Sequence, residues 1–191
     1  MVKTNPKKTS SYTGTGITFC ALIIILASIM LQARDVPPLS DYVSKTKSST
    51  KPYDTFEQFY PHYLREHSDV TTRQWHYFGT TLVILYVLCN PMLVLPILAS
   101  GVAGYASMPF FRHLPTGIVE SSMLLSTFII GGRLVTSSWK RTFIPILLGY
   151  SFAWIGHFFF EHNKPATFIY PTYSLLGDFR MFYDAISKQQ F

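Results

Sequence analysis

Long apolar stretches, separated by short polar segments, dominate this chain. The longest stretch runs from Trp75 to Phe111 and exceeds the ~20 residues that one transmembrane helix needs. Asn90 and Pro91 interrupt it near the middle, and proline both lacks a backbone donor and disfavours helix in the residue before it. We therefore predict two spans, at 74–89 and 92–111, that form a hairpin. The alternative is a single kinked helix through 75–100, because membrane helices tolerate proline.

Three more apolar segments extend this pattern. Residues 117–132 and 142–160 are predicted as the third and fourth spans of the core, although Glu120 lies within the former. Residues 16–33 follow a basic, Ser/Thr-rich segment and end in a poor cleavage sequence. We predict that they form an uncleaved signal anchor, and a cleaved signal peptide is the alternative. Residues 34–53 contain proline, serine and lysine without apolar periodicity, which is typical of a linker.

Two amphipathic segments flank the predicted core. In 54–67 aromatic and apolar side chains recur at helical spacing, and Asp54 with Glu57 has the spacing of a capping box. Thr71 or Thr72 is the N-cap expected for the next helix. The tail predicts a short helix from Ser174 with four inward-facing apolar residues: Leu175, Leu176, Phe179 and Phe182.

The predicted fold class is therefore all-α. We expect a polytopic membrane helical bundle of about four core spans, with an N-terminal span and interfacial amphipathic helices. Two parts are predicted: residues 1–53 form a tail, a single span and a linker, and residues 54–191 form the membrane-embedded helical domain.

Composition supports a membrane protein and excludes several other classes. Hydrophobic residues make up 48% of the chain and charged residues only 14%, whereas soluble domains average about a quarter charged. The net charge of +6 is spread over short clusters beside the apolar runs, so no basic stripe supports nucleic-acid binding. Cys20 and Cys89 lie inside apolar runs, and no disulfide is expected. Phosphate loops, serine-nucleophile elbows and zinc-protease signatures are absent from the sequence.

Histidines and one carboxylate gather at matching ends of the predicted spans. His157 and Glu161 are four residues apart, which places both on one face of an α-helix. His67 and His76 can converge because the break at 68–72 separates the helices that carry them. Imidazole with carboxylate suits Fe, Zn or Mn, and an open site of this kind suits Fe(II) oxygen chemistry. The alternative is that these groups lie among lipid headgroups.

A site shared by His76 and Glu161 requires a particular membrane topology. His76 precedes the first core span and Glu161 follows the last, so they meet only if an even number of spans separates them. The hypothesis therefore requires the turn at Asn90–Pro91. His62 and His113 are interpreted as interface residues without a role in the site.

Four ordered segments resemble a known family. They are FYPHYLREH (59–67), RQWHYFGT (73–80), AWIGHFFFEHNKPATFIYP (153–171) and SLLGDFRM (174–181). Together they resemble the small polytopic membrane family of the fungal 2-hydroxy fatty acid dioxygenase, over roughly 54–184 with a less similar stretch at 107–142. The resemblance implies Fe(II)-dependent, 2-oxoglutarate-independent α-oxidation of 2-hydroxypalmitate, in phytosphingosine breakdown at the endoplasmic reticulum.

The resemblance also implies roles for individual residues. By position, His67, His76, His157 and Glu161 match the polar motif residues of the family. His162 is a weaker metal ligand, because the family often has lysine at its position. The expected cofactor is Fe(II), chelated by the carboxylate and 2-hydroxyl of the substrate beside dioxygen. Besides Glu161, Asn163 and Lys164 are the expected catalytic residues, which orient the substrate carboxylate.

The expected partners are a membrane lipid or 2-hydroxy fatty acid and O2. The alternative function is a non-catalytic structural subunit of a larger membrane complex, in which the motif serves packing; a homo-oligomer is a further arrangement. The expected location is the endoplasmic reticulum, with the mitochondrial inner membrane as the alternative. Stoichiometric iron in the purified protein favours the enzyme over the subunit.

Overall fold

The computed structural model describes residues 6–32 and 51–188, and this part of the chain is helical and free of strands. The helices are α1 (Pro6–Gln32), α3 (Phe56–Arg65), α4 (Val70–Cys89), α5 (Val94–Phe111), α6 (Ile118–Thr136), α7 (Trp139–Ile155) and α8 (Pro171–Lys188). Three short helical segments join them: η2 (Pro91–Leu93), η3 (Gly156–Glu161) and η4 (Ala166–Phe168). The predicted all-α class is confirmed. Of the predicted linker at 34–53, residues 34–50 lie outside the described residues.

Within the described residues, four segments are long and apolar enough to cross a membrane: Tyr12–Gln32, Pro91–Phe111, Ile118–Thr136 and Trp139–Glu161. The chain is therefore an integral membrane protein. The segment predicted as a span at 74–89 lies in α4 and is not among these four, so three candidate spans separate His76 from Glu161 and not the even number that the prediction required. His76 and His157 still meet, because α4 packs along α7. The first half of α4 carries Arg73, Gln74 and His76, which makes this helix less apolar than the four candidate spans.

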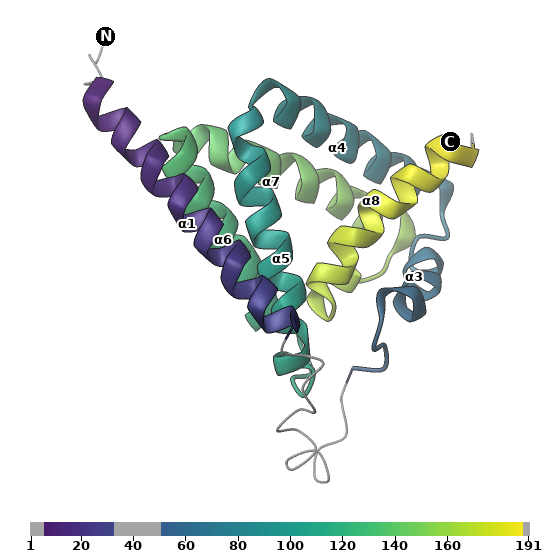
Figure 1. The fold of residues 1–191 in the computed structure, drawn as a ribbon. Helices are drawn as coiled ribbons and strands as arrows, with labels where there is room; N and C mark the ends of the chain where they lie inside the picture. The colour runs from purple at the N-terminus through teal and green to yellow at the C-terminus, as the bar shows by residue number, and fades with distance from the viewer. Residues whose placement is uncertain (1–5, 33–50, 189–191) are drawn as a thin grey trace, which may run out of the picture.

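The chain turns at Asn90–Pro91, as predicted. Helix α4 ends at Cys89, and the Asn90 side-chain amide donates to the Tyr86 carbonyl oxygen at 3.0 Å. The alternative of one helix through 75–100 is therefore wrong. The predicted hairpin also needs correction, because α4 packs along α7 while α5 packs along α6 and α1. Figure 1 shows the two groups diverging from the turn, with α8 across the opening between them.

Small residues bring the N-terminal span against the core. A Cβ atom on Gly16 of α1 would lie 2.7 Å from the Val135 nitrogen, and one on Gly131 of α6 would lie 2.9 Å from the Cys20 sulfur. Close helix approach through small residues is the usual way in which membrane helices associate. Helix α1 therefore packs on the outer side of α5 and α6.

The helices outside the spans differ in detail from the prediction. The N-caps are Thr55 and Asp69, one and two residues from those expected, because their side chains accept from the free backbone N–H groups of α3 and α4. Helix α8 begins at Pro171, three residues earlier than predicted. Two of the four residues predicted to face inward, Leu176 and Phe179, are 39% and 40% exposed.

The buried face of α8 consists mainly of small and polar residues. It comprises Thr172, Tyr173, Ser174, Gly177, Met181 and Ala185. A Cβ atom on Gly177 would lie 3.0 Å from the ring of Tyr63 on α3, so a large side chain cannot occupy this face. The rule that large apolar residues face inward fails here, because a helix beside a membrane has apolar surroundings on its outer face too.

Candidate metal centre

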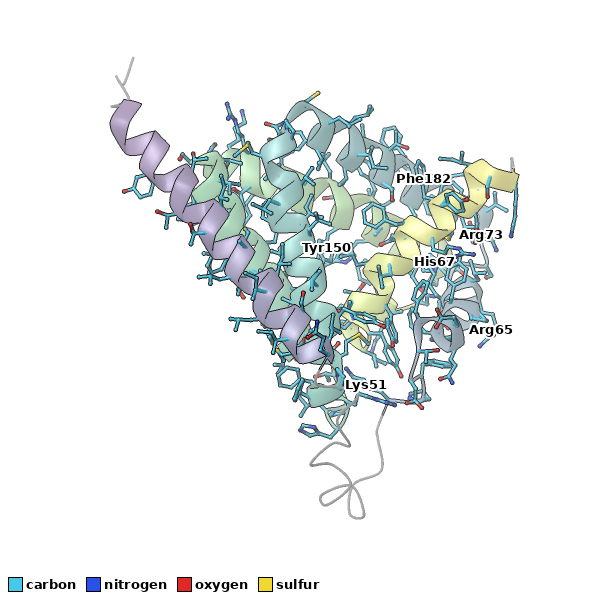
Figure 2. All side chains as sticks on the ribbon, viewed as in Figure 1. Lys51, Arg65, His67, Arg73, Tyr150 and Phe182 are labelled. Carbon is cyan, nitrogen blue, oxygen red and sulfur yellow. The ribbon has the colours of Figure 1, made fainter. Side chains whose placement is uncertain are left out.

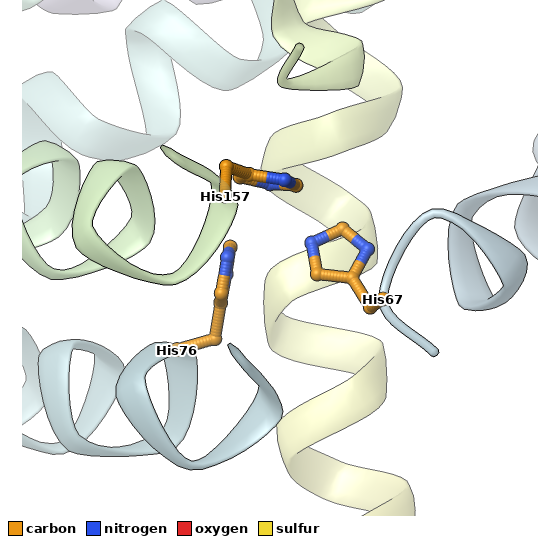
Figure 3. Close-up of side chains that lie close together, drawn as sticks. All are labelled: His67, His76 and His157. Carbon is orange, nitrogen blue, oxygen red and sulfur yellow. The ribbon is translucent and has the colours of Figure 1, made fainter. Parts of the chain in front are cut away.

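Three histidines from three elements converge in the protein. His67 lies in the turn after α3, His76 on α4 and His157 on η3, and their side chains point toward one another (Figure 3). They are 0%, 5% and 2% exposed. Their ring centroids are 4.5 Å apart for His67 and His76, 4.6 Å for His67 and His157, and 5.1 Å for His76 and His157. One nitrogen from each lies within 4.8 Å of the others, which is close enough for all three to hold one metal ion.

Hydrogen bonds fix the turn that carries His67. The Arg73 side chain donates through Nε to the His67 carbonyl oxygen at 2.6 Å. The carboxylate of Glu161 accepts from the Ser68 N–H, the Ser68 hydroxyl and the Asp69 N–H at 2.6, 2.7 and 2.9 Å. Glu161 therefore ties the end of η3 to the start of α4. This link sets the positions of His67 and His157 relative to each other.

A close contact brings His157 beside α4. The Thr72 hydroxyl donates to the Gly156 carbonyl oxygen at 3.2 Å. A Cβ atom on Gly156 would lie 3.1 Å from Thr72 Cγ2, so glycine permits this approach of the two backbones. Residues Gly156–Glu161 form a π-helical turn, which is rare and occurs frequently at functional sites. After it, Asn163 N–H donates back to the His157 carbonyl oxygen at 3.1 Å.

Each histidine is anchored by an oxygen acceptor at Nδ1. The partner of His67 is the Tyr63 carbonyl oxygen at 2.7 Å, that of His76 is Asp178 Oδ1 at 2.6 Å, and that of His157 is Asn163 Oδ1 at 2.7 Å. A carbonyl or carboxylate oxygen can only accept, so these bonds assign the proton to Nδ1. Each Nε2 then carries the lone pair that a metal needs, which is the usual arrangement around metal-bound histidine.

The Nε2 atoms of the histidines show whether a metal ion would fit between them. Nε2 of His67 and Nε2 of His76 are buried without a hydrogen-bond partner. A buried unsatisfied acceptor costs about 1–3 kcal/mol, and a metal ion shared by the histidines would satisfy both. The donor set of three imidazoles suits Zn, Cu, Fe or Ni better than Ca or Mg. The residues present therefore fit a transition-metal ion.

The protonation states of His67 and Asp178 favour the binding of a cation. Burial, and then the neighbouring His76 and His157 imidazoles, lower the pKa of His67 to about 3, so this ring is unprotonated at neutral pH. Burial raises the pKa of Asp178, but His76 and the hydrogen bond from the Tyr63 hydroxyl outweigh it and hold that pKa below its ordinary value. Asp178 therefore supplies one negative charge behind His76.

The other predicted site residues have different places. Glu161 binds Ser68 and Asp69, as described above, and is not in the cluster of metal-ligating side chains found in the described residues. Asn163 holds His157 and donates through Nδ2 to the Glu66 carbonyl oxygen at 2.9 Å. Lys164 and His162 are exposed. His62 and His113 also lie outside the cluster.

Asp178 and Tyr63 are functional candidates that the sequence did not reveal. Asp178 is 102 residues from His76, and the prediction for the tail named only the apolar residues of a short helix. Tyr63 was assigned to an apolar stripe, yet its hydroxyl donates to Asp178 Oδ1 at 2.7 Å. The available signal was that Asp178 lies in SLLGDFRM and Tyr63 in FYPHYLREH, two of the four segments that carry the family resemblance.

A largely apolar cavity adjoins the histidines. His76, His157 and Asp178 line it together with apolar side chains from α4 to α8: Val83, Ile97, Leu124, Phe128, Ile146 and Leu175. Tyr150 also borders it, and Figure 2 places this residue between α5 and α8. The cavity therefore has titratable groups in one part of its wall and room beside them for an apolar ligand.

Comparison with known proteins gives the family. Searches of curated proteins and of solved structures found no match. The model of one family, described as "2-hydroxy-palmitic acid dioxygenase Mpo1-like", matches residues 53–190. The matched range contains the three clustered histidines and Asp178, and it confirms the resemblance found in the sequence. The chain therefore belongs to the Mpo1-like family.

Proposed function

We propose that this protein is an Fe(II)-dependent dioxygenase that shortens 2-hydroxy long-chain fatty acids by one carbon. The observation that carries the proposal is the buried cluster of His67, His76 and His157 beside an apolar cavity. The family description, which names a 2-hydroxy-palmitic acid dioxygenase, supports the choice of substrate class. The proposed setting is sphingoid-base breakdown in the membrane of the endoplasmic reticulum.

The proposed reaction is balanced without another reductant. A 2-hydroxy acid and O2 give an acid one carbon shorter, CO2 and water, as the bond between C1 and C2 breaks. Fe(II), held through Nε2 of the three histidines, would supply the binding and activation of dioxygen beside the chelated substrate. Three protein ligands leave positions open for both reactants, as in other catalytic metal sites with three ligands.

The residues of the chain bind and orient the groups that react. Tyr63, Asp178 and Asn163 keep the three imidazoles in the tautomer that binds metal. The Ser174 hydroxyl is buried without a hydrogen-bond partner and borders the cavity one helical turn before Asp178. Ser174 is therefore placed to hydrogen-bond the carboxylate or 2-hydroxyl of the substrate. We assign it this role in preference to Lys164, which is exposed.

The apolar wall of the cavity performs two tasks in this proposal. It receives the acyl chain and keeps its methylenes from water, each of which would cost about 0.8 kcal/mol if exposed. It also excludes water from the reacting groups, which strengthens the interactions of the charged Asp178 with its partners. Binding energy from the chain thus serves to hold the reacting end at the histidines.

The test combines metal analysis with turnover. Purified protein should contain stoichiometric iron and convert 2-hydroxypalmitate with one O2 consumed per CO2 released, without 2-oxoglutarate. Palmitate should not react, because it lacks the second chelating oxygen. The variant His157→Ala should lose iron and activity, and the matched control His113→Ala, at an exposed position, should keep both.

Two results would contradict the proposal. Similar turnover of palmitate and 2-hydroxypalmitate would exclude chelation by the 2-hydroxyl. A protein without bound metal that always purifies in one large membrane complex would favour the structural-subunit alternative.

A further inference from the structure

A second hollow lies on the surface between α6 and α7. Its wall shares residues with the cavity beside the histidines, among them Ser121, Leu125, Ile146, Tyr150 and Trp154. The two spaces are therefore separated by single side chains and not by a helix. The cavity at the candidate metal centre therefore adjoins a hollow on the outer surface of two candidate membrane-spanning helices.

The packing of α6 and α7 explains why the hollow forms where it does. Near their connection the two helices touch closely, because a Cβ atom on Gly132 would lie 2.8 Å from Thr142 Cγ2. The hollow lies toward the opposite ends, between the first turns of α6 and the later turns of α7. The helices are in contact at one end and spaced apart at the other.

The rim of the hollow is apolar and faces outward. Ile118 is 67% exposed, Leu147 is 62% exposed and Phe168 is 53% exposed. Ile118 and Leu147 belong to segments that are candidate membrane spans. Exposed apolar side chains on such helices face lipid, so the hollow opens sideways toward the bilayer.

The chemistry of the walls restricts what can pass. Among the residues that line the two spaces, Asp178 is the single acidic or basic side chain apart from His76 and His157. These groups all belong to the metal centre. The remaining wall offers no charge to bind a headgroup along the way and suits an acyl chain.

We propose that the space between α6 and α7 is a lateral passage through which the acyl chain of the substrate reaches the histidines from the bilayer. Tyr150 and Trp154 are the largest side chains that line both spaces. This inference rests on the proposed function for its substrate class. A long-chain acid in the bilayer then reaches the site without its tail crossing water, a transfer that the hydrophobic effect opposes.

A pair of serine variants tests the passage. Ser122 is exposed and lines the outer hollow but not the cavity beside the histidines. Ser126, one turn further along α6, is exposed and lines neither space. In lipid nanodiscs, Ser122→Trp should raise KM for 2-hydroxypalmitate about tenfold, because the indole would fill the outer hollow and obstruct entry of the acyl chain. Ser126→Trp should behave as wild type, and both variants should keep their iron. Equal kinetics for the two variants would overturn the passage.

A labelling experiment separates this inference from the proposed function. A 2-hydroxy fatty acid with a photoreactive diazirine at its chain end is added to nanodiscs, and the labelled peptides are identified. Labels should fall on 118–128 and 143–154 and decrease in Ser122→Trp, whether or not the acid is turned over. Inactive wild type with this labelling pattern refutes the dioxygenase and supports the passage. Active wild type labelled equally in Ser122→Trp, or labelled outside α6 and α7, refutes the passage.

Discussion

Replacing Asp178 by asparagine isolates the charge behind the histidine cluster. Oδ1 of Asp178 accepts from His76 Nδ1 at 2.6 Å and from the Tyr63 hydroxyl at 2.7 Å, and asparagine keeps the size and one acceptor oxygen. It removes the negative charge, which is present at neutral pH because the pKa of Asp178 is held below its ordinary value. It also allows the amide NH2 to face His76, which would move the ring proton to Nε2 and block metal binding.

The expected loss follows from the position of Asp178 behind a ligand. Outer partners of metal-binding histidines typically contribute 10–100-fold in metal affinity, so Asp178→Asn should weaken binding by about 1.4–2.7 kcal/mol. The assay is competition between the protein and a chromophoric chelator for Fe(II) under anaerobic conditions. Tyr63→Phe is the matched control, because it removes one neutral hydrogen bond from the same oxygen and leaves the charge in place. Its loss of affinity should be smaller.

Two outcomes would refute this reasoning. If Asp178→Asn binds Fe(II) as tightly as wild type, His76 is not a ligand or its Nδ1 partner has no influence. If Tyr63→Phe loses as much affinity as Asp178→Asn, the carboxylate acts through packing and not through its charge. Thermal unfolding of the metal-free proteins shows whether either variant is damaged beyond the site.

Two further predictions concern the contacts of Glu161 beside the site and the buried ion pair between Lys51 and Glu120. Glu161→Gln should keep most of the iron, because the amide oxygen can still accept from Ser68. Glu161→Ala, which has no acceptor, should lose the iron. Complete loss in both variants would indicate that Glu161 is itself a ligand. Lys51 and Glu120 form an ion pair at 2.7 Å with 2% and 1% exposure, so Lys51→Met alone should destabilise the protein by about 3–5 kcal/mol in denaturant titrations. The double variant Lys51→Met/Glu120→Leu should recover most of this loss, and equal instability of the single and double variants would exclude a buried-charge penalty.

The sequence predicted the helices well where local chemistry determines them. The break at Asn90–Pro91 follows from the missing donor of proline and from the length of the apolar run, and both act within a few residues. The divergence of α4 from α5 was not predictable, because it depends on contacts such as that of Gly79 with Phe152, 2.9 Å from a Cβ atom placed on the glycine. Such contacts join residues far apart in the chain.

The residues of the candidate site were likewise predictable only in part from the sequence. His67, His76 and His157 stood out because titratable side chains are few in so apolar a chain, and the structure brings them together. The contacts of Glu161 escaped prediction, because α-helical spacing was assumed for a segment that forms a π-helical turn. Asp178 escaped because its pairing with His76 exists only after α8 has folded against α4.

The π-helical turn constrains how this segment can vary among related sequences. Its length fixes the spacing between His157 and Asn163, whose side chains meet at 2.7 Å. The three residues inside it, Phe158, Phe159 and Phe160, are 48%, 69% and 40% exposed and contribute no polar contact to the cluster. Substitution among apolar residues is therefore tolerable at these positions, whereas loss or gain of a single residue removes the oxygen that orients His157. We therefore expect the number of residues between His157 and Asn163 to be more constrained in related sequences than the identity of those residues.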